Sequence, residues 1–276
     1  MRALPFLIAL GGGKLIAPSL IRTLTAHGHL RDNYRERRLP LPFGLLIAIV
    51  APLALVPLLL IERLGETDVF RAEIGPVALY CFGVLGLGLI DDCFGTEQSA
   101  PRGWRGHGAA ALRGELSTGV IKAAGSLGLA LLATSYLSLS NGRWLLASGV
   151  LVLATNAFNL LDLRPGRSLK ALVLLGACLT LGAWDLRPLW TLGLFAGPAL
   201  VAGAYDLRER AMLGDTGANL LGALAGLWLV LTLSTTGQLI ALCALAAINI
   251  YGELRSISTL VEKTPGLRQL DSWGRP

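Results

Sequence analysis

The sequence predicts an all-α integral membrane protein, a polytopic bundle of about nine transmembrane helices that forms a single membrane domain over residues 1–276. The chain is 53% hydrophobic and only 15% charged, whereas about 25% of the residues in an ordinary soluble domain are charged. Its apolar residues also occur in long runs that short polar loops separate. These observations exclude a secreted disulfide scaffold and favour a chain that crosses the bilayer many times.

Each expected span is an apolar run of roughly membrane length. About 20 helical residues cross the hydrocarbon core, and shorter runs are common where a helix is buried among others. In the first run, Gly11–Gly13 and Lys14 interrupt the apolar residues, which indicates a local kink with a snorkelling lysine. Several runs are short, and merging or splitting the last four would change the count. The spans are 3–24, 41–61, 74–90, 116–138, 144–161, 169–184, 188–205, 216–234 and 238–252.

Loops on alternate sides of the expected bundle differ in positive charge. One set carries sixteen lysines and arginines and the other carries five. Because cytoplasmic loops carry the excess of these residues, we expect the N-terminus outside and the C-terminus in the cytoplasm. The same bias explains the net charge of +6 without a nucleic-acid partner. The expected cytoplasmic loops are 25–40, 91–115, 162–170, 206–215 and 253–276.

Acidic residues stand at the ends of three runs. Asp91 and Asp92 directly follow the third run, Asp162 follows the fifth, and Asp215 precedes the eighth. Adjacent carboxylates at a membrane edge repel each other unless a cation or proton chemistry compensates. All four fall on the predicted cytoplasmic side, which indicates a metal-dependent reaction at the bilayer surface. Hydrated carboxylates at a helix end are the alternative interpretation of the tandem pair.

Further polar residues accompany these acids. Asn156, Asn159 and Asp162 recur at three-residue spacing and share one face of a helix. An asparagine such as Asn156 often hydrogen-bonds a neighbouring helix, whereas Asn159 and Asp162 lie where a soluble ligand can reach. Glycines flank Asp215 and Thr216 at the start of a span. That segment is either a helix N-cap or a place where a phosphate and Mg²⁺ approach the backbone closely.

Four segments carry a resemblance to a known family. They are a basic first loop (Asn33–Gly44), a paired-aspartate motif (Leu89–Asp92), an Asn-Ala-x-Asn segment (Asn156–Asp162) and a Gly-Asp motif (Gly214–Gly222). In this order, on one predicted face, they resemble the polyprenyl-phosphate N-acetylhexosamine-1-phosphate transferases, the superfamily that includes phospho-N-acetylmuramoyl-pentapeptide transferase (glycosyltransferase family 4). The resemblance covers about residues 25–265.

The resemblance implies a phosphotransferase that moves a sugar 1-phosphate from a UDP-sugar onto a polyprenyl phosphate, such as undecaprenyl phosphate, for cell-wall or cell-surface glycan synthesis. It implies Mg²⁺ as cofactor, with Mn²⁺ as the alternative ion. The expected location is the plasma (inner) membrane of a bacterium, with the active face in the cytoplasm. The implied partners are the lipid acceptor, the nucleotide-sugar, membrane lipid and, as in related proteins, a second copy in a homodimer.

The resemblance also implies roles for individual residues. The implied catalytic residues are Asp91, Asp92 and Asp215, and the implied metal ligands are Asp215 and Asp92. A snorkelling role is the alternative for Lys122, and positive-inside anchoring is the alternative for the arginines of the first loop. The residues assigned to substrate binding are Asn159, Asp162, Lys122, Arg35, Arg38, Gly214 and Thr216.

The sequence departs from the family pattern at several positions. No lysine closely follows the aspartate pair, where Cys93 stands instead, and Leu163 and Pro165 replace a glycine and an acid. The expected histidines after Pro265 are also missing. These departures motivate a second hypothesis, a catalytically inactive transferase-like membrane scaffold. A third hypothesis is an ion-coupled transporter, whose coupling acids usually lie near the bilayer midplane rather than at span ends.

Overall fold

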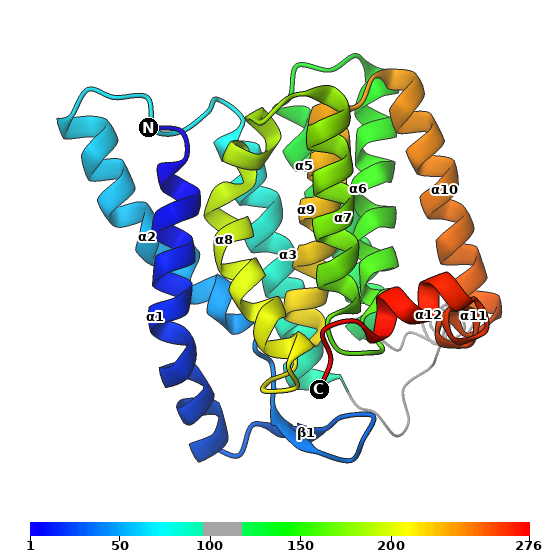
Figure 1. Ribbon diagram of the computed structural model, residues 1–276. Coiled ribbons are helices and arrows are strands. Elements are labelled where there is room, and N and C mark those ends of the chain that lie inside the picture. Colours follow the sequence, from blue (N-terminus) through cyan, green and yellow to red (C-terminus); the bar gives the residue numbers. More distant parts are fainter. Residues whose placement is uncertain (96–117) are drawn as a thin grey trace.

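A computed structural model describes residues 1–95 and 118–276 of the chain. Within those ranges the chain forms eleven helices and one short β-hairpin (Figure 1). In chain order the elements are α1 (Leu4–Ala26), β1 (Leu30–Asp32), β2 (Arg38–Pro40), α2 (Leu45–Leu64), α3 (Ile74–Phe94), α5 (Thr118–Ser135), α6 (Asn141–Leu161), α7 (Arg167–Ala183), α8 (Arg187–Leu207), α9 (Gly214–Thr232), α10 (Thr235–Leu254), α11 (Ile257–Lys263) and α12 (Pro265–Ser272).

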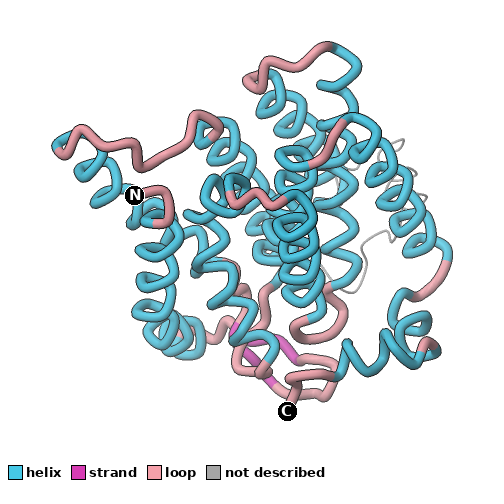
Figure 2. The backbone as a smooth tube through the Cα atoms, turned by 45° about the horizontal axis from the view of Figure 1, so that its top comes forward, coloured by secondary structure: helices cyan, strands magenta, loops and turns pink. Residues whose placement is uncertain are grey.

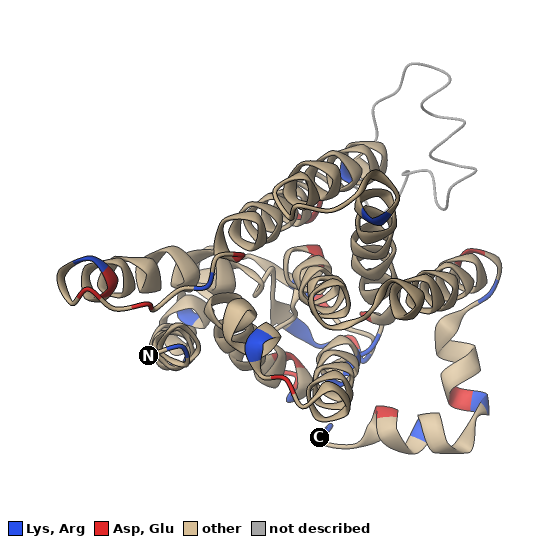
Figure 3. Cartoon of the chain, turned by 90° about the horizontal axis from the view of Figure 1, so that it is seen from above, with Lys and Arg blue, Asp and Glu red and all other residues tan. Residues whose placement is uncertain are grey.

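Most of these helices are suited to a bilayer. Among the described residues, eight helices are long and apolar enough to cross a membrane, namely α1, α2, α3, α5, α6, α8, α9 and α10. Each of them has an 18-residue stretch with at most two charged residues, and most of the ribbon seen from above is uncharged (Figure 3). The protein is therefore a multi-pass helical membrane bundle. The remaining expected span corresponds to α7, whose 17 residues fall short of the roughly 20 that a full crossing takes.

Successive long helices run in opposite directions, so the loops gather at the two ends of the bundle (Figures 1 and 2). We call one of these the hairpin end, because β1 and β2 lie there. Helices α1, α3, α6, α8 and α10 end at the hairpin end, and α2, α5, α7 and α9 begin there. The C-terminal helices α11 and α12 lie at the same end (Figure 1).

Helix α9 forms the centre of the bundle. Every residue from Thr216 to Leu229 is buried, and α9 contacts α3, α6, α7 and α8. Glycines permit this packing: a Cβ on Gly222 would lie 2.6 Å from Cα of Thr155 in α6, and one on Gly88 of α3 would lie 2.6 Å from Cα of Thr216. Close backbone contact of this kind is a main source of attraction between helices in lipid, where apolar burial contributes little.

The helix boundaries place the tandem acids differently from the prediction. The third span was expected to end at residue 90, but α3 continues to Phe94. Asp91 and Asp92 therefore belong to the last turn of a helix and point from fixed positions, rather than lying in a loop. The last turn is closed by a hydrogen bond of 2.7 Å from the backbone N–H of Gly95 to the backbone carbonyl of Asp91.

The predicted loops contain structure that the sequence analysis did not anticipate. In the loop expected over 25–40, β1 and β2 pair antiparallel with Leu30 opposite Pro40. The segment 253–276 contains α11 and α12. For the loop expected over 91–115, the part from residue 96 onward lies outside the described residues.

Candidate functional site

Three helices bring an ion-paired cluster together at the hairpin end. The ammonium Nζ of Lys122, in α5, lies 2.8 Å from Oδ2 of Asp91 in α3 and 2.5 Å from Oδ2 of Asp215 in α9. All three side chains are partly accessible, with 17%, 18% and 31% of their surfaces exposed, respectively. The cluster is thus open to a ligand but shielded enough for its charges to interact strongly.

A fourth helix adds an amide to this cluster. With its amide oriented to satisfy both neighbours, Asn159 of α6 donates to Oδ1 of Asp215 at 3.0 Å and accepts from Nζ of Lys122 at 3.1 Å. We call Asp91, Lys122, Asn159 and Asp215 the Lys122 centre. All four were predicted from the sequence as site residues, and they come from four different helices.

The second tandem acid has a different role. Both oxygens of the Asp92 carboxylate accept hydrogen bonds from the first turn of α9: Oδ1 from the backbone N–H of Asp215 at 2.9 Å, and Oδ2 from the backbone N–H of Thr216 at 2.8 Å and its hydroxyl at 2.6 Å. The positive end of the α9 dipole also favours this carboxylate. Asp92 therefore caps α9 from outside that helix and fixes the direction of Asp215.

Gly214 fits tightly against this cap. Its φ is +70°, in the left-handed region, and a Cβ built on it would lie 2.7 Å from Oδ2 of Asp92. Only glycine meets both conditions without strain. An N-cap formed by Asp215 and Thr216 for their own helix was one of the two interpretations of this segment. The structure instead assigns the cap to Asp92, which leaves the Asp215 carboxylate facing Lys122.

A second pair of acids lies beside the centre. Burial raises the pKa of Asp162, at the end of α6, well above its ordinary value, and the nearby Asp206 raises it further, with smaller contributions from Asp215 and Asp92. Asp206 is buried and accepts hydrogen bonds from the backbone N–H of Gly166 at 2.6 Å and of Leu213 at 3.3 Å. Asp206 thereby ties the loop before α7 to the loop before α9.

The first loop is fastened to the loop before α9 by a second buried acid. Glu209, which has a left-handed φ of +51°, accepts from the Tyr34 hydroxyl at 3.1 Å and from Asn33 at 3.3 Å, and it pairs with Arg35 at 3.2 Å and Arg37 at 3.5 Å. Backbone hydrogen bonds join the same segments. Met212 donates to the Pro40 carbonyl at 2.9 Å, and Phe43 donates to the Met212 carbonyl at 2.8 Å.

The structure therefore does not bring the predicted arginines of the first loop into the Lys122 centre. Arg35 is held by Glu209, and Arg38 lies in β2 with an exposed side chain. Asp206 and Glu209 are buried residues near the site that the sequence analysis did not single out. The signal for Asp206 was present, because it is an acid at the end of an apolar run, as Asp162 is.

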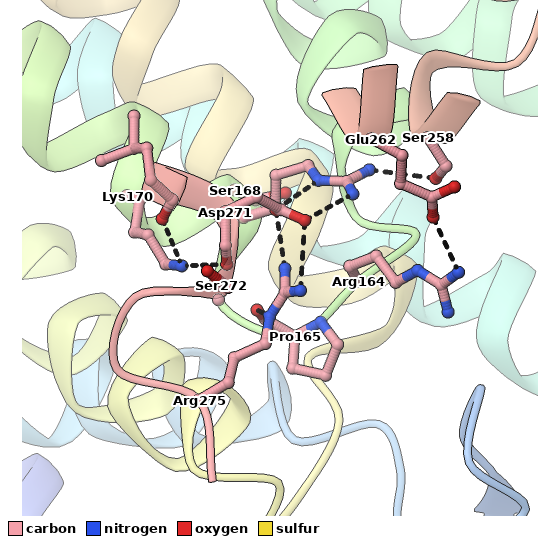
Figure 4. Close-up of polar contacts among 12 residues, drawn as sticks. Arg164, Pro165, Ser168, Lys170, Ser258, Glu262, Asp271, Ser272 and Arg275 are labelled. Atoms are coloured by element: carbon pink, nitrogen blue, oxygen red, sulfur yellow. Dashed lines mark hydrogen bonds and ion pairs between the residues drawn. The ribbon is translucent and has the colours of Figure 1, made fainter. Parts of the chain in front are cut away.

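A third polar network anchors the C-terminal helices at the same end. The carboxylate of Asp271, in α12, forms ion pairs with Arg167 at 2.8 Å and with Arg275 at 2.7 Å (Figure 4). Arg164 forms an ion pair with Glu262 of α11 at 3.3 Å. Burial alone would raise the pKa of Asp271, but its two arginines outweigh that effect and hold the pKa below the ordinary value. Arg164 and Arg167 are therefore engaged in holding the C-terminal segment.

The donor atoms of the Lys122 centre suit a divalent cation. Within residues 1–95 and 118–276, no group of three or more His, Cys, Asp and Glu side chains is arranged to hold a metal. Mg²⁺ does not require such a group, because it is commonly held by one or two carboxylates, with water and phosphate oxygens completing its shell. Asp91 and Asp215 already share a cation, the Lys122 ammonium, whereas the Asp92 oxygens accept hydrogen bonds from the first turn of α9. Of these three carboxylates, Asp215 and Asp91 are the two placed to share a cation, whereas Asp92 is committed to α9.

Comparison with known proteins adds no assignment. No protein-family model matches the chain, and no curated protein matches it either. Membership of the transferase superfamily accordingly stays a prediction from the four sequence segments.

Proposed function

We propose that the protein is a membrane phosphotransferase that moves a sugar 1-phosphate from a UDP-sugar onto a polyprenyl phosphate, with the hairpin end facing the cytoplasm. The observation that carries the proposal is the convergence of Asp91, Lys122, Asn159 and Asp215 from four helices. The four sequence segments that resemble the transferases supply the reaction class. Both reactants are anionic, so such an enzyme mainly has to neutralise charge and hold the phosphates in line.

Charge balance at the Lys122 centre supports phosphate chemistry. The carboxylates of Asp91 and Asp215 face a single ammonium there, and a second cation would reduce the repulsion between the two carboxylates. Mg²⁺, held by Asp215 and Asp91, would offset the negative charge of the pyrophosphate. Once Mg²⁺ holds the two carboxylates, the nearby Lys122 ammonium would be available to bind a phosphate oxygen. A general base is not essential, since a phosphate monoester is mostly deprotonated at neutral pH.

The remaining residues of the site would position the substrates. Asp92 and Gly214 hold the first turn of α9 and so aim Asp215. Asn159 and Asp162, at the end of α6, would contact the sugar or nucleoside. This division differs from the initial assignment of Asp92 to the metal, and it makes Asp92 a positioning residue.

We assign the hydrocarbon chain of the acceptor to an apolar cavity that α7, α10, α11 and α12 line, next to the end of α6. The cavity has a volume of about 490 Å³ and is lined by side chains that include Leu161, Leu174, Ile248 and Leu270. Leu161 directly precedes Asp162, so a chain in the cavity would reach the acidic end of α6. Apolar walls with a few polar groups at one side are usual for sites that bind amphipathic ligands.

The position of the acids along the helices argues against the transporter hypothesis. Asp91 is in the last turn of α3 and Asp215 is in the first turn of α9. Coupling acids of transporters typically lie near the bilayer midplane. Acids at helix ends favour chemistry at the membrane surface.

A donor screen tests the proposal. Purified protein is incubated with Mg²⁺, polyprenyl phosphate and a panel of radiolabelled UDP-sugars, and UMP release is measured. The proposal predicts release with at least one donor and a loss of about 100-fold or more in Asp215→Asn. Asp68→Asn is the matched control, because Asp68 is exposed at the opposite end. No release with any donor would instead favour the scaffold hypothesis.

A further inference from the structure

A second feature of the bundle, a groove between α1 and α8, is not used by the proposed reaction. The two helices run side by side in the same direction: a Cβ on Gly193 would lie 2.9 Å from Cβ of Phe6, and one on Gly13 would lie 3.2 Å from the Val201 side chain. Gly12, on the opposite face of α1 from Leu10 and Lys14, packs against α2 through Val50. The groove thus opens on the face of α1 that α2 does not cover.

The groove combines an apolar wall with three cations. Its volume is about 330 Å³, and its lining includes Leu10 and Leu200 together with Lys14, Arg208 and Arg210. The three basic side chains are exposed. None of them pairs with a carboxylate among the residues that the structure describes.

The nearby acids are turned away from these cations. Glu209 stands between Arg208 and Arg210 in the sequence, but its carboxylate is buried and pairs with Arg35 and Arg37. Asp206 is buried as well and accepts hydrogen bonds from backbone N–H groups. The segment therefore presents two arginines outward while its acids are neutralised inside.

The three cations are spread along the hairpin-end half of the groove. Lys14 is adjacent to Gly13, which is level with Val201, six residues before the end of α8; at 1.5 Å per residue this is about 9 Å from the helix end. A lysine at that depth extends its ammonium toward the interface. Arg208 and Arg210 follow the last residue of α8. Arg208 and Arg210 thus mark the hairpin end of the groove, and the apolar side chains of Leu10 and Leu200 lie farther into the bundle.

We propose that this groove binds an anionic phospholipid of the surrounding bilayer, with its phosphodiester among Lys14, Arg208 and Arg210 and an acyl chain along Leu10 and Leu200. Basic pockets between transmembrane helices recognise anionic headgroups in this way. A soluble phosphate would leave the apolar wall unused, and a zwitterionic lipid would leave the three cations without net counter-charge.

The test is native mass spectrometry of the full-length protein in detergent, titrated with phosphatidylglycerol or phosphatidylcholine. We expect phosphatidylglycerol to bind at least tenfold more tightly. Each basic residue removed should weaken its binding about fivefold, so the triple variant Lys14→Gln, Arg208→Gln, Arg210→Gln should lose the preference. Lys14→Arg and Arg208→Lys keep the charge and should retain it.

A second triple variant controls for total charge. Arg22→Gln, Arg255→Gln and Arg268→Gln removes three exposed cations at the same end but outside the groove, and it should bind phosphatidylglycerol within twofold of the wild type. The proposal is overturned if the wild type binds both lipids equally or if the two triple variants behave alike. It is also overturned if inorganic phosphate or polyprenyl phosphate, but not phosphatidylglycerol, binds in a manner that depends on the three groove residues.

Discussion

Lys122 and Asp215 stand 93 residues apart in the sequence, yet the ammonium of one lies 2.5 Å from a carboxylate oxygen of the other. The same ammonium contacts Asp91. An ion pair at this position joins α5 to α9 and concentrates charge at the hairpin end. This contact and the Asp92 cap that orients Asp215 together set the geometry of the Lys122 centre.

Replacing the lysine should separate its structural role from its competition with a metal. In Lys122→Met, Asp91 and Asp215 face each other without a counter-charge, and we expect a loss of about 3–5 kcal/mol in stability without divalent ions. The variant should bind Mn²⁺ more tightly than the wild type, since the ammonium no longer occupies the carboxylates. Thermal unfolding and electron paramagnetic resonance measure the two effects. Lys263→Met, at an exposed position of α11, is the control. Unchanged Mn²⁺ affinity in Lys122→Met would contradict the assignment of a shared cation site.

The two tandem acids should respond differently to mutation. Asp92→Ala removes three hydrogen bonds from the first turn of α9 and should lower the free energy of unfolding by about 2–4 kcal/mol. Asp91→Ala removes one partner of Lys122 and should reduce Mn²⁺ affinity more than Asp92→Ala does. Chemical unfolding and Mn²⁺ titration of the two variants check this. The interpretation fails if Asp92→Ala is the weaker Mn²⁺ binder and the more stable protein.

Gly214→Ala tests the tight turn before α9. Its left-handed φ costs about 1 kcal/mol for alanine, and the new Cβ would overlap the Asp92 carboxylate. We expect a lower melting temperature and weaker Mn²⁺ binding, because Asp215 shifts. Gly86→Ala is a matched control, since no atom lies within 4 Å of a Cβ there, and it should be neutral or slightly stabilising. Equal behaviour of the two variants would show that the turn does not constrain the site.

Acid should release the C-terminal helices. The pKa of Asp271 is lower in the folded protein than in the unfolded chain, where it is about 3.9. The corresponding stability is therefore fully present above about pH 4 and is lost as the pH falls through the lower folded value. The measurement is the protection of residues 265–276 against amide hydrogen exchange, relative to the unfolded chain at each pH between pH 7 and pH 3. Asp271→Asn should raise exchange already at pH 7, whereas an unchanged rate in this variant would exclude Arg167 and Arg275 as anchors.

The sequence predicted the membrane bundle because long apolar runs leave few alternatives. It also predicted that Asp91, Lys122, Asn159 and Asp215 belong to one site. It did not separate Asp91 from Asp92, because adjacent residues on a helix differ by about 100° in direction and that direction depends on where α3 ends. The roles of Glu209 and Asp271 were also out of reach, because Arg35 and Arg37, which pair with Glu209, and Arg167, which pairs with Asp271, lie far away in the sequence and meet these acids only after the chain folds.

The most direct test of the central claim is the transfer of label from a UDP-sugar radiolabelled in its sugar to the lipid fraction by purified protein with Mg²⁺ and polyprenyl phosphate. We predict transfer by the wild type and by Asp68→Asn, and a loss of at least about 100-fold in Asp215→Asn. Transfer that persists in Asp215→Asn, or its absence from the wild type with every donor, would contradict the account.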